Sequence, residues 1–164
     1  MTAIRQTLFL IAASCLLCAF VVGDYASVRA SNKPLVVIVS AATPLHDIST
    51  AQLRRAFLGD ATEYATGKRL IPINHPLNTA PRISFDRSVL NLKASEVGPF
   101  WVDRRIRDQS GPPKTAPSAD LALRLAMSLV GAISYAYADQ LNDKVRALTI
   151  DGKTAAASGY LLAE

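Results

Sequence analysis

The sequence predicts an α/β fold, with a mixed, partly parallel sheet flanked by helices. Two observations predict this class. Short apolar runs rich in β-branched residues, typical of buried strands, alternate with helical patterns from residue 35 to residue 150. The chain has 164 residues, of which 50% are hydrophobic and 19% charged, which suits one domain and excludes a wholly disordered protein.

The N-terminus has the pattern of a secretory signal peptide. An uncharged run of 15 residues, Leu8–Val22, follows Arg5. A membrane-spanning helix needs about 20 apolar residues, whereas a signal-peptide core needs about 7–15. Val28 and Ala30 provide aliphatic and small residues at the −3 and −1 positions of a cleavage site. We therefore expect a signal peptide over residues 1–30 and a periplasmic or secreted protein, with an uncleaved anchor as the alternative.

Export limits the chemistry of the remaining chain. Cys15 and Cys18 lie in the segment that is removed, so residues 31–164 contain no thiol. Removal of the segment also lowers the net charge from +5 to +4. The densest group of cations, within residues 104–107, is flanked by Asp103 and Asp108, which is typical of a solvated helix face. We expect no nucleic-acid partner.

The first elements are a buried strand and a capped helix. The continuous apolar run Leu35–Val39 predicts a strand covered on both faces. Ser49 and Gln52 have the spacing of a capping box, so a helix should begin there and continue to Leu58. Gly59 is the expected C-terminal stop.

The next unit is a strand, a turn and a helix. A polar loop over residues 62–68 leads to a predicted strand at Leu70–Asn74. Pro72 cannot donate a hydrogen bond to a neighbouring strand, which favours a strand that lies at an edge or is short. A polar turn follows at His75–Thr79, and a helix should run from about Pro81 to Leu92, because proline is tolerated in a first helical turn.

The last third of the chain contains two further helices and two strands. One helix begins near Ser95, and the other is capped by Ser118 and ended by Gly131. The apolar sides expected for them are Val97, Phe100, Trp101 and Ile106 for the first and Leu121, Leu125 and Leu129 for the second. Strands are predicted at Ala132–Ala136 and Val145–Ile150. The alanine-rich tail after Gly152 should be weakly ordered.

The residues give little support for catalysis. The two histidines, His46 and His75, lie 29 positions apart without a metal-binding spacing or a cysteine partner. No nucleophile elbow and no glycine-rich phosphate loop is present. Trp101 has the helical spacing of a core residue, which favours packing over ligand stacking. We predict a non-enzymatic protein without a metal or a cofactor.

The turn before the helix at residue 81 is a candidate anion site. Ligands gather at the carboxyl ends of strands in open α/β sheets, where helix N-termini point. The free N–H groups of such a terminus carry about half a positive charge. Asn78 and Thr79 could cap the helix or contact a ligand, and a bound oxyanion would compensate the unfavourable cation of Arg82. The alternative is an ordinary capped helix with Arg82 directed into water.

Four segments together resemble the substrate-binding proteins of phosphate ABC transporters, in the periplasmic-binding-protein-like superfamily. The segment Leu53–Gly59 resembles the family's IF-x-G helix end, and His75–Pro81 stands in place of its Arg-Ser-x-x-Ser-Gly-Thr anion loop. Gly131–Tyr135 is similar to its GAIGY strand, and Ile150–Gly152 with Gly159–Leu161 is similar to its closing segment. The resemblance spans about Leu35 to Leu161. It departs in the loop, where His75 replaces arginine and Thr79-Ala80 replaces Ser-Gly.

The resemblance implies one lobe of a type 2 periplasmic binding protein. Residues 31–164 would form a single such domain, which recognises a small oxyanion such as phosphate in connection with phosphate ABC transport. The ligand-binding residues it implies are His75, Asn78, Thr79, Ala80 and Arg82, with Thr43 contributing from the loop after the first strand. A membrane transporter or a protein partner would cover the face where a second lobe packs. The alternative is an interaction or sensory module that kept the fold without a ligand.

Overall fold

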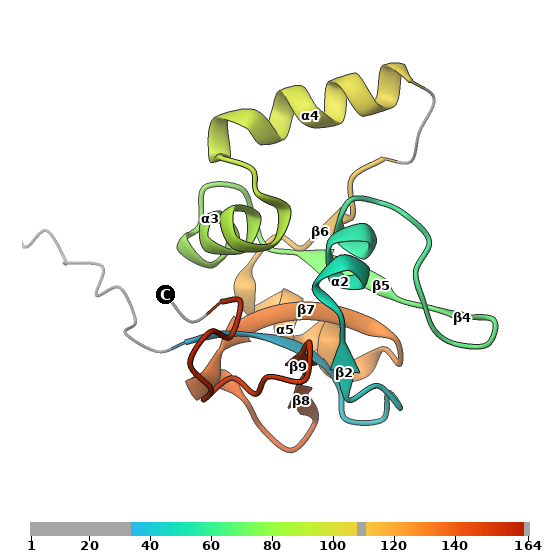
Figure 1. Cartoon of the computed structure of the whole chain (residues 1–164), viewed down its shortest axis with the longest axis vertical. Helices are drawn as coiled ribbons and strands as arrows, with labels where there is room; N and C mark the ends of the chain where they lie inside the picture. The colour runs from blue at the N-terminus through green and yellow to red at the C-terminus, as the bar shows by residue number, and fades with distance from the viewer. Residues whose placement is uncertain (1–33, 108–110, 163–164) are drawn as a thin grey trace, which may run out of the picture. The chain divides into compact units, whose positions relative to one another are not determined.

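The computed structural model describes residues 34–107 and 111–162, so the predicted signal peptide lies outside the described residues. The strands are β1 Leu35–Ser40, β2 Asp47–Ile48, β3 Glu63–Ala65, β4 Lys68–Arg69, β5 Ile71–Asn74, β6 Lys114–Thr115, β7 Ala132–Tyr137, β8 Val145–Ala147 and β9 Thr149–Ile150. The helices are α2 Thr50–Phe57, α3 Ala80–Phe85, η1 Asp86–Leu90, α4 Ala94–Ile106, α5 Ala119–Ser128 and η2 Ala138–Gln140 (Figure 1). Strands and helices alternate as the sequence predicts.

Five strands form the central sheet, in the order β6-β5-β7-β1-β8. Strand β5 pairs in parallel with β6 and β7, whereas β1 is antiparallel to both β7 and β8. The sheet is therefore mixed and partly parallel, which confirms the predicted fold class. Every residue of β1 is buried, as the continuous apolar run predicts.

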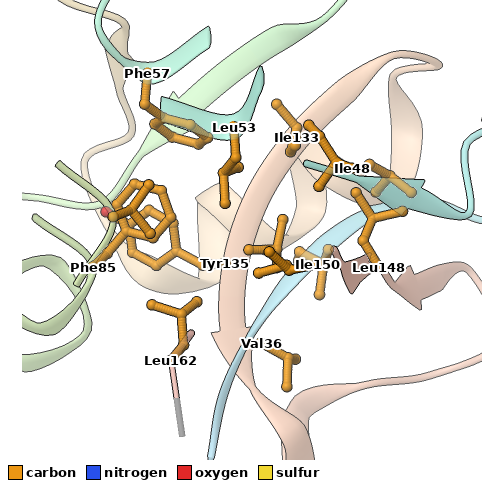
Figure 2. Close-up of a cluster of buried hydrophobic side chains, with 14 of the residues drawn as sticks. Val36, Ile48, Leu53, Phe57, Phe85, Ile133, Tyr135, Leu148, Ile150 and Leu162 are labelled. Carbon is orange, nitrogen blue, oxygen red and sulfur yellow. The ribbon is translucent and has the colours of Figure 1, made fainter. Parts of the chain in front are cut away.

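Helices cover both faces of this sheet. Alternate residues of a strand point to opposite faces. On β7, Tyr135 contacts the rings of Phe57 and Phe85, which belong to α2 and α3. Ala132 instead packs in a cluster with Ala122 of α5. The main core lies on the Tyr135 side, where Figure 2 shows Leu53, Phe57 and Phe85 gathered around that ring.

Of the two alternatives for the strand containing Pro72, the short strand is confirmed, because β5 has 4 residues. The edge position is wrong, because β5 lies between β6 and β7. The N–H of Ile71 donates to the carbonyl of Gly131, just before β7, so the nitrogen of Pro72 faces the other side. There β6 pairs only from Ile73 onward, at Lys114. The N–H that Pro72 lacks would therefore face the side of β5 where, at this position, no strand is paired.

Several local predictions differ from the structure. The polar loop over residues 62–68 contains the antiparallel pair β3 and β4, and the predicted last strand divides into β8 and β9. In α5 the buried residues are Ala122 and Ala126, because small side chains let the helix approach the sheet, while Leu129 is exposed. In α4 only Val97 is buried.

The tail after Gly152 is also better packed than its composition indicates. Tyr160 and Leu162 are buried in the main core. The Tyr160 hydroxyl accepts a hydrogen bond from the N–H of Val37 at 3.2 Å and donates to the carbonyl of Leu148 at 3.2 Å. The prediction of a weakly ordered tail overlooked this one aromatic anchor.

Candidate anion-binding site

The candidate site is the turn that joins β5 to α3. Asn78 has a φ of 65°, a left-handed conformation that asparagine tolerates better than most residues. The Thr79 hydroxyl donates to the carbonyl of Pro76 at 2.8 Å, which closes the turn. Thr79 is the N-cap residue of α3, yet it makes no side-chain capping bond, and Pro81 follows in the first turn as predicted. The N–H groups at the start of α3 therefore receive no acceptor from the N-cap side chain.

The side chain of Arg82 is buried and does not extend into water. Its Nε lies 2.6 Å from Oδ2 of Asp86, and the two side chains are only 4% and 3% exposed. Its Nη1 donates to the carbonyl of His75 at 3.3 Å. Burial raises the pKa of Asp86, and the nearby charge of Arg82 opposes that shift. The unfavourable cation in the first turn is thus compensated by Asp86.

His75 is a structural residue at the base of the turn. Its ring is buried and stacks on Tyr135, with centroids 4.5 Å apart and an interplanar angle of 18°. Nε2 lies 2.7 Å from the Tyr135 carbonyl, which can only accept, so this nitrogen carries the proton. Burial lowers the pKa of His75, and the charge of Arg82 lowers it further, against the opposing effect of the Tyr135 bond. A neutral, enclosed imidazole cannot act as an anion clamp.

The ring of Tyr135 holds this region together. Phe85 also stacks on it, at 4.1 Å and 10°, and two parallel rings this close must occupy opposite faces. The Tyr135 hydroxyl donates to Oδ1 of Asn74 and accepts from the N–H of His75, each at 3.3 Å. Burial raises the pKa of Tyr135 far above its ordinary value, so the hydroxyl stays protonated. The end of β5 and the last residue of α3 are thereby held against β7.

Thr43 is not part of this arrangement. Its hydroxyl accepts a hydrogen bond from the N–H of Gly131 at 2.9 Å, just before β7 begins. Because β1 is antiparallel to β7 while β5 is parallel to it, the loop after β1 lies at the start of β5. The turn at residues 75–79 follows the other end of β5, about 10 Å away at 3.3 Å per residue. The structure therefore brings together His75, Asn78, Thr79, Ala80 and Arg82, without Thr43.

Sequence reasoning missed Asn74, Asp86 and Tyr135. The four-residue spacing of Arg82 and Asp86 is a sequence signal for an ion pair on a helix. The contacts of Tyr135 carry no local signal, because they depend on the pairing of β5 with β7.

Residues 34–107 and 111–162 provide neither a metal-binding cluster nor a membrane-spanning helix. No group of three or more histidine, cysteine, aspartate or glutamate side chains could hold a metal ion there. No helix in that part of the chain is long and apolar enough to cross a membrane.

No protein-family model and no curated protein sequence matches the chain. Among solved structures, the chain is similar to a phosphate-bound structure from Clostridium perfringens, assigned to a phosphate ABC transporter substrate-binding protein. The identity is 17% and the TM-score 0.60, over 75% of this chain and 47% of that chain. The chain is also similar to an ABC-type phosphate transport receptor from Vibrio cholerae. The identity is 13% and the TM-score 0.59, over 75% of this chain and 48% of that chain. For PstS from Borrelia burgdorferi the identity is 14% and the TM-score 0.55, over 74% of this chain and 49% of that chain.

These similarities confirm the predicted resemblance at the level of the fold. The neighbours are substrate-binding and transport-receptor proteins. The chain spans about half the length of each of them. It has the fold of about one half of a phosphate-transport substrate-binding protein.

Proposed function

We propose that this chain is an exported, non-enzymatic binding domain that recognises a small oxyanion such as phosphate at the turn Asn78–Arg82. One observation carries the proposal. The helix that begins at Ala80 starts without a side-chain cap, because the Thr79 hydroxyl is bonded to the Pro76 carbonyl. Free N–H groups at a helix start form an anion site. The likeness in fold to a protein with bound phosphate supports the choice of ligand.

The roles differ from those implied by the sequence resemblance. The N–H groups of Thr79, Ala80 and Arg82 and the exposed amide of Asn78 would contact the anion. The charge of Arg82 is balanced by Asp86, so it contributes little. His75 would support the turn through its stacking contact with Tyr135. Such a site is exposed and lacks a free cation, so we expect binding of about millimolar strength, near 4 kcal/mol.

We further propose that residues 1–30 direct export, that the chain acts in the periplasm or outside the cell, and that its role is linked to phosphate ABC transport. A transporter or another protein would supply the rest of the binding surface, since the chain spans about half of its structural neighbours.

The test is a titration of the full chain with phosphate and with sulfate, followed by amide NMR. We expect saturable shifts at Asn78, Thr79 and Ala80. Ala80→Pro removes one N–H while keeping a residue that suits a first helical turn, and should weaken binding about three- to tenfold. Ala94→Pro makes the same change at the first position of α4 and should leave binding unchanged. No shift at Thr79 or Ala80 at millimolar phosphate would rule out the proposal.

A second candidate is an interaction module without a ligand. Ile71, Leu129 and Val130 are exposed, and they lie together at the start of the paired strands β5 and β7, where Ile71 bonds to the Gly131 carbonyl. An apolar patch of this kind favours a protein partner. Light scattering and pull-down with the chain and an Ile71→Ser variant would test it, and a strictly monomeric chain without a partner would exclude it.

A further inference from the structure

Helix α4 leaves its apolar side uncovered toward its C-terminal end. It runs for 13 residues, yet only Val97 is buried. Val102 is 61% exposed and Ile106 is 78% exposed. Figure 1 shows α4 beyond α3, on the side away from the sheet. Ile106, which the sequence assigns to the apolar side of this helix, is therefore exposed at the surface.

These side chains form one wall of a hollow of about 310 Å³. Trp101, Val102, Arg105 and Ile106 line it from α4, and Pro112 lines it from the segment before β6. The four α4 residues are spaced so that they lie on one face of the helix. The volume is at the lower end of the range for small-molecule sites, which begins at about 300 Å³.

The wall of this hollow is held in place by two contacts. The ring of Trp101 packs edge to face against Phe100, with centroids 5.0 Å apart at 84°. Arg104 forms an ion pair with Asp60 at 2.5 Å, which ties α4 to the residues after α2. These contacts position Trp101 and the α4 backbone beside the hollow.

The charges around the hollow favour an anionic group. Arg105 is the charged residue among the described ones that line it. Its neighbours Arg104 and Arg107 are paired with Asp60 and Asp103, while Arg105 has no ion-pair partner among the described residues. The described lining residues thus combine apolar side chains with one cation, Arg105, and include no carboxylate.

The geometry points to a second binding site, separate from the turn Asn78–Arg82, for a small amphiphilic carboxylate. Its hydrocarbon part would lie against Trp101, Val102 and Ile106, and its carboxylate would pair with Arg105. The inference does not depend on the proposed recognition of phosphate, because no residue is shared between the two sites.

The chain's single tryptophan provides the assay. Octanoate added to the full chain should change the fluorescence of Trp101 saturably. Octylamine, which has the same hydrocarbon chain and the opposite charge, should not. Arg105→Gln should weaken octanoate binding about two- to fivefold, as expected for a partly exposed ion pair. Ile106→Ser should weaken it at least about fivefold through lost apolar contact.

Both substituted residues are exposed, so the variants should fold as the parent does. The control is Arg87→Gln, an exposed arginine on η1 outside the lining, which should bind octanoate like the parent. Equal responses to octanoate and octylamine, or an unchanged affinity in Arg105→Gln, would overturn the inference. A molar mass that rises with protein concentration, and that Ile106→Ser returns to the monomer value, would overturn it by assigning this face to a second copy of the chain.

Discussion

The buried pair of Arg82 and Asp86 predicts a large loss of stability when one partner is removed. In Arg82→Met the carboxyl of Asp86 keeps its place, 2% exposed, without its cation. Breaking a buried pair in this way costs about 3–5 kcal/mol, a large part of the roughly 5–15 kcal/mol that holds a domain folded. With a slope of about 1–3 kcal/mol per molar urea, the midpoint should fall by about 2 M.

The control for this variant is Arg124→Met. Arg124 pairs with Asp120 at the same four-residue spacing at 2.9 Å, but these side chains are 61% and 70% exposed. That substitution should cost under about 0.5 kcal/mol. The double variant Arg82→Met/Asp86→Leu should recover most of the loss, because no charge remains buried. Urea unfolding followed by circular dichroism measures all four proteins.

The pH dependence supplies a second readout. Burial already raises the pKa of Asp86, and without Arg82 the shift should grow. A raised carboxyl pKa stabilises the fold at low pH, and this stability is lost as the pH rises through the folded value. The defect of Arg82→Met should therefore shrink toward about pH 4. The reasoning fails if Arg82→Met and Arg124→Met lose equal stability, or if the double variant loses as much stability as Arg82→Met.

Two further outcomes can be measured by the same unfolding assay. Because burial lowers the pKa of His75, the unfolded chain binds a proton at a pH where the folded chain does not. The free energy of unfolding should therefore fall as the pH drops below about 6.5, and His75→Phe should reduce that dependence. Gly131→Ala should cost about 1–3 kcal/mol, because φ is 86° and a Cβ would lie 2.9 Å from the Tyr64 ring and 3.1 Å from the Arg69 carbonyl. Gly67→Ala, with a φ of 70° and nothing within 4 Å, should cost only about 1 kcal/mol, and equal losses at the two glycines would contradict this account.

The sequence predicts the fold best where the signals are local. The capping box of Ser49 and Gln52 is present at the start of α2, with Ser49 Oγ accepting from the Gln52 N–H and Gln52 Oε1 accepting from the Ser49 N–H. The apolar run of β1 is buried throughout. Such features involve residues a few positions apart, so they can be predicted from the sequence without knowledge of the tertiary structure.

The candidate site is less predictable because its contacts are distant in sequence. The location of Thr43 depends on β1 being antiparallel to β7, and a continuous apolar run does not reveal strand direction. The burial of His75 depends on Tyr135, 60 positions later. The resemblance assigns an anion-binding role to this turn, but it could not show that Asp86 pairs with Arg82.

The position of β1 between β7 and β8 has a consequence for how the chain reaches its folded state. This strand, the most apolar in the sheet, is the first to leave the ribosome, yet its partners β7 and β8 end only at Tyr137 and Ala147. Until about residue 147 has been made, no complete set of partners exists for β1, so its exposed backbone and apolar side chains can join other chains. The Tyr160 hydroxyl, 123 positions from the N–H of Val37, delays completion further. The sheet can therefore be completed only after most of the chain has been synthesised. A chaperone that binds extended apolar segments would bind near the beginning of the domain, at β1.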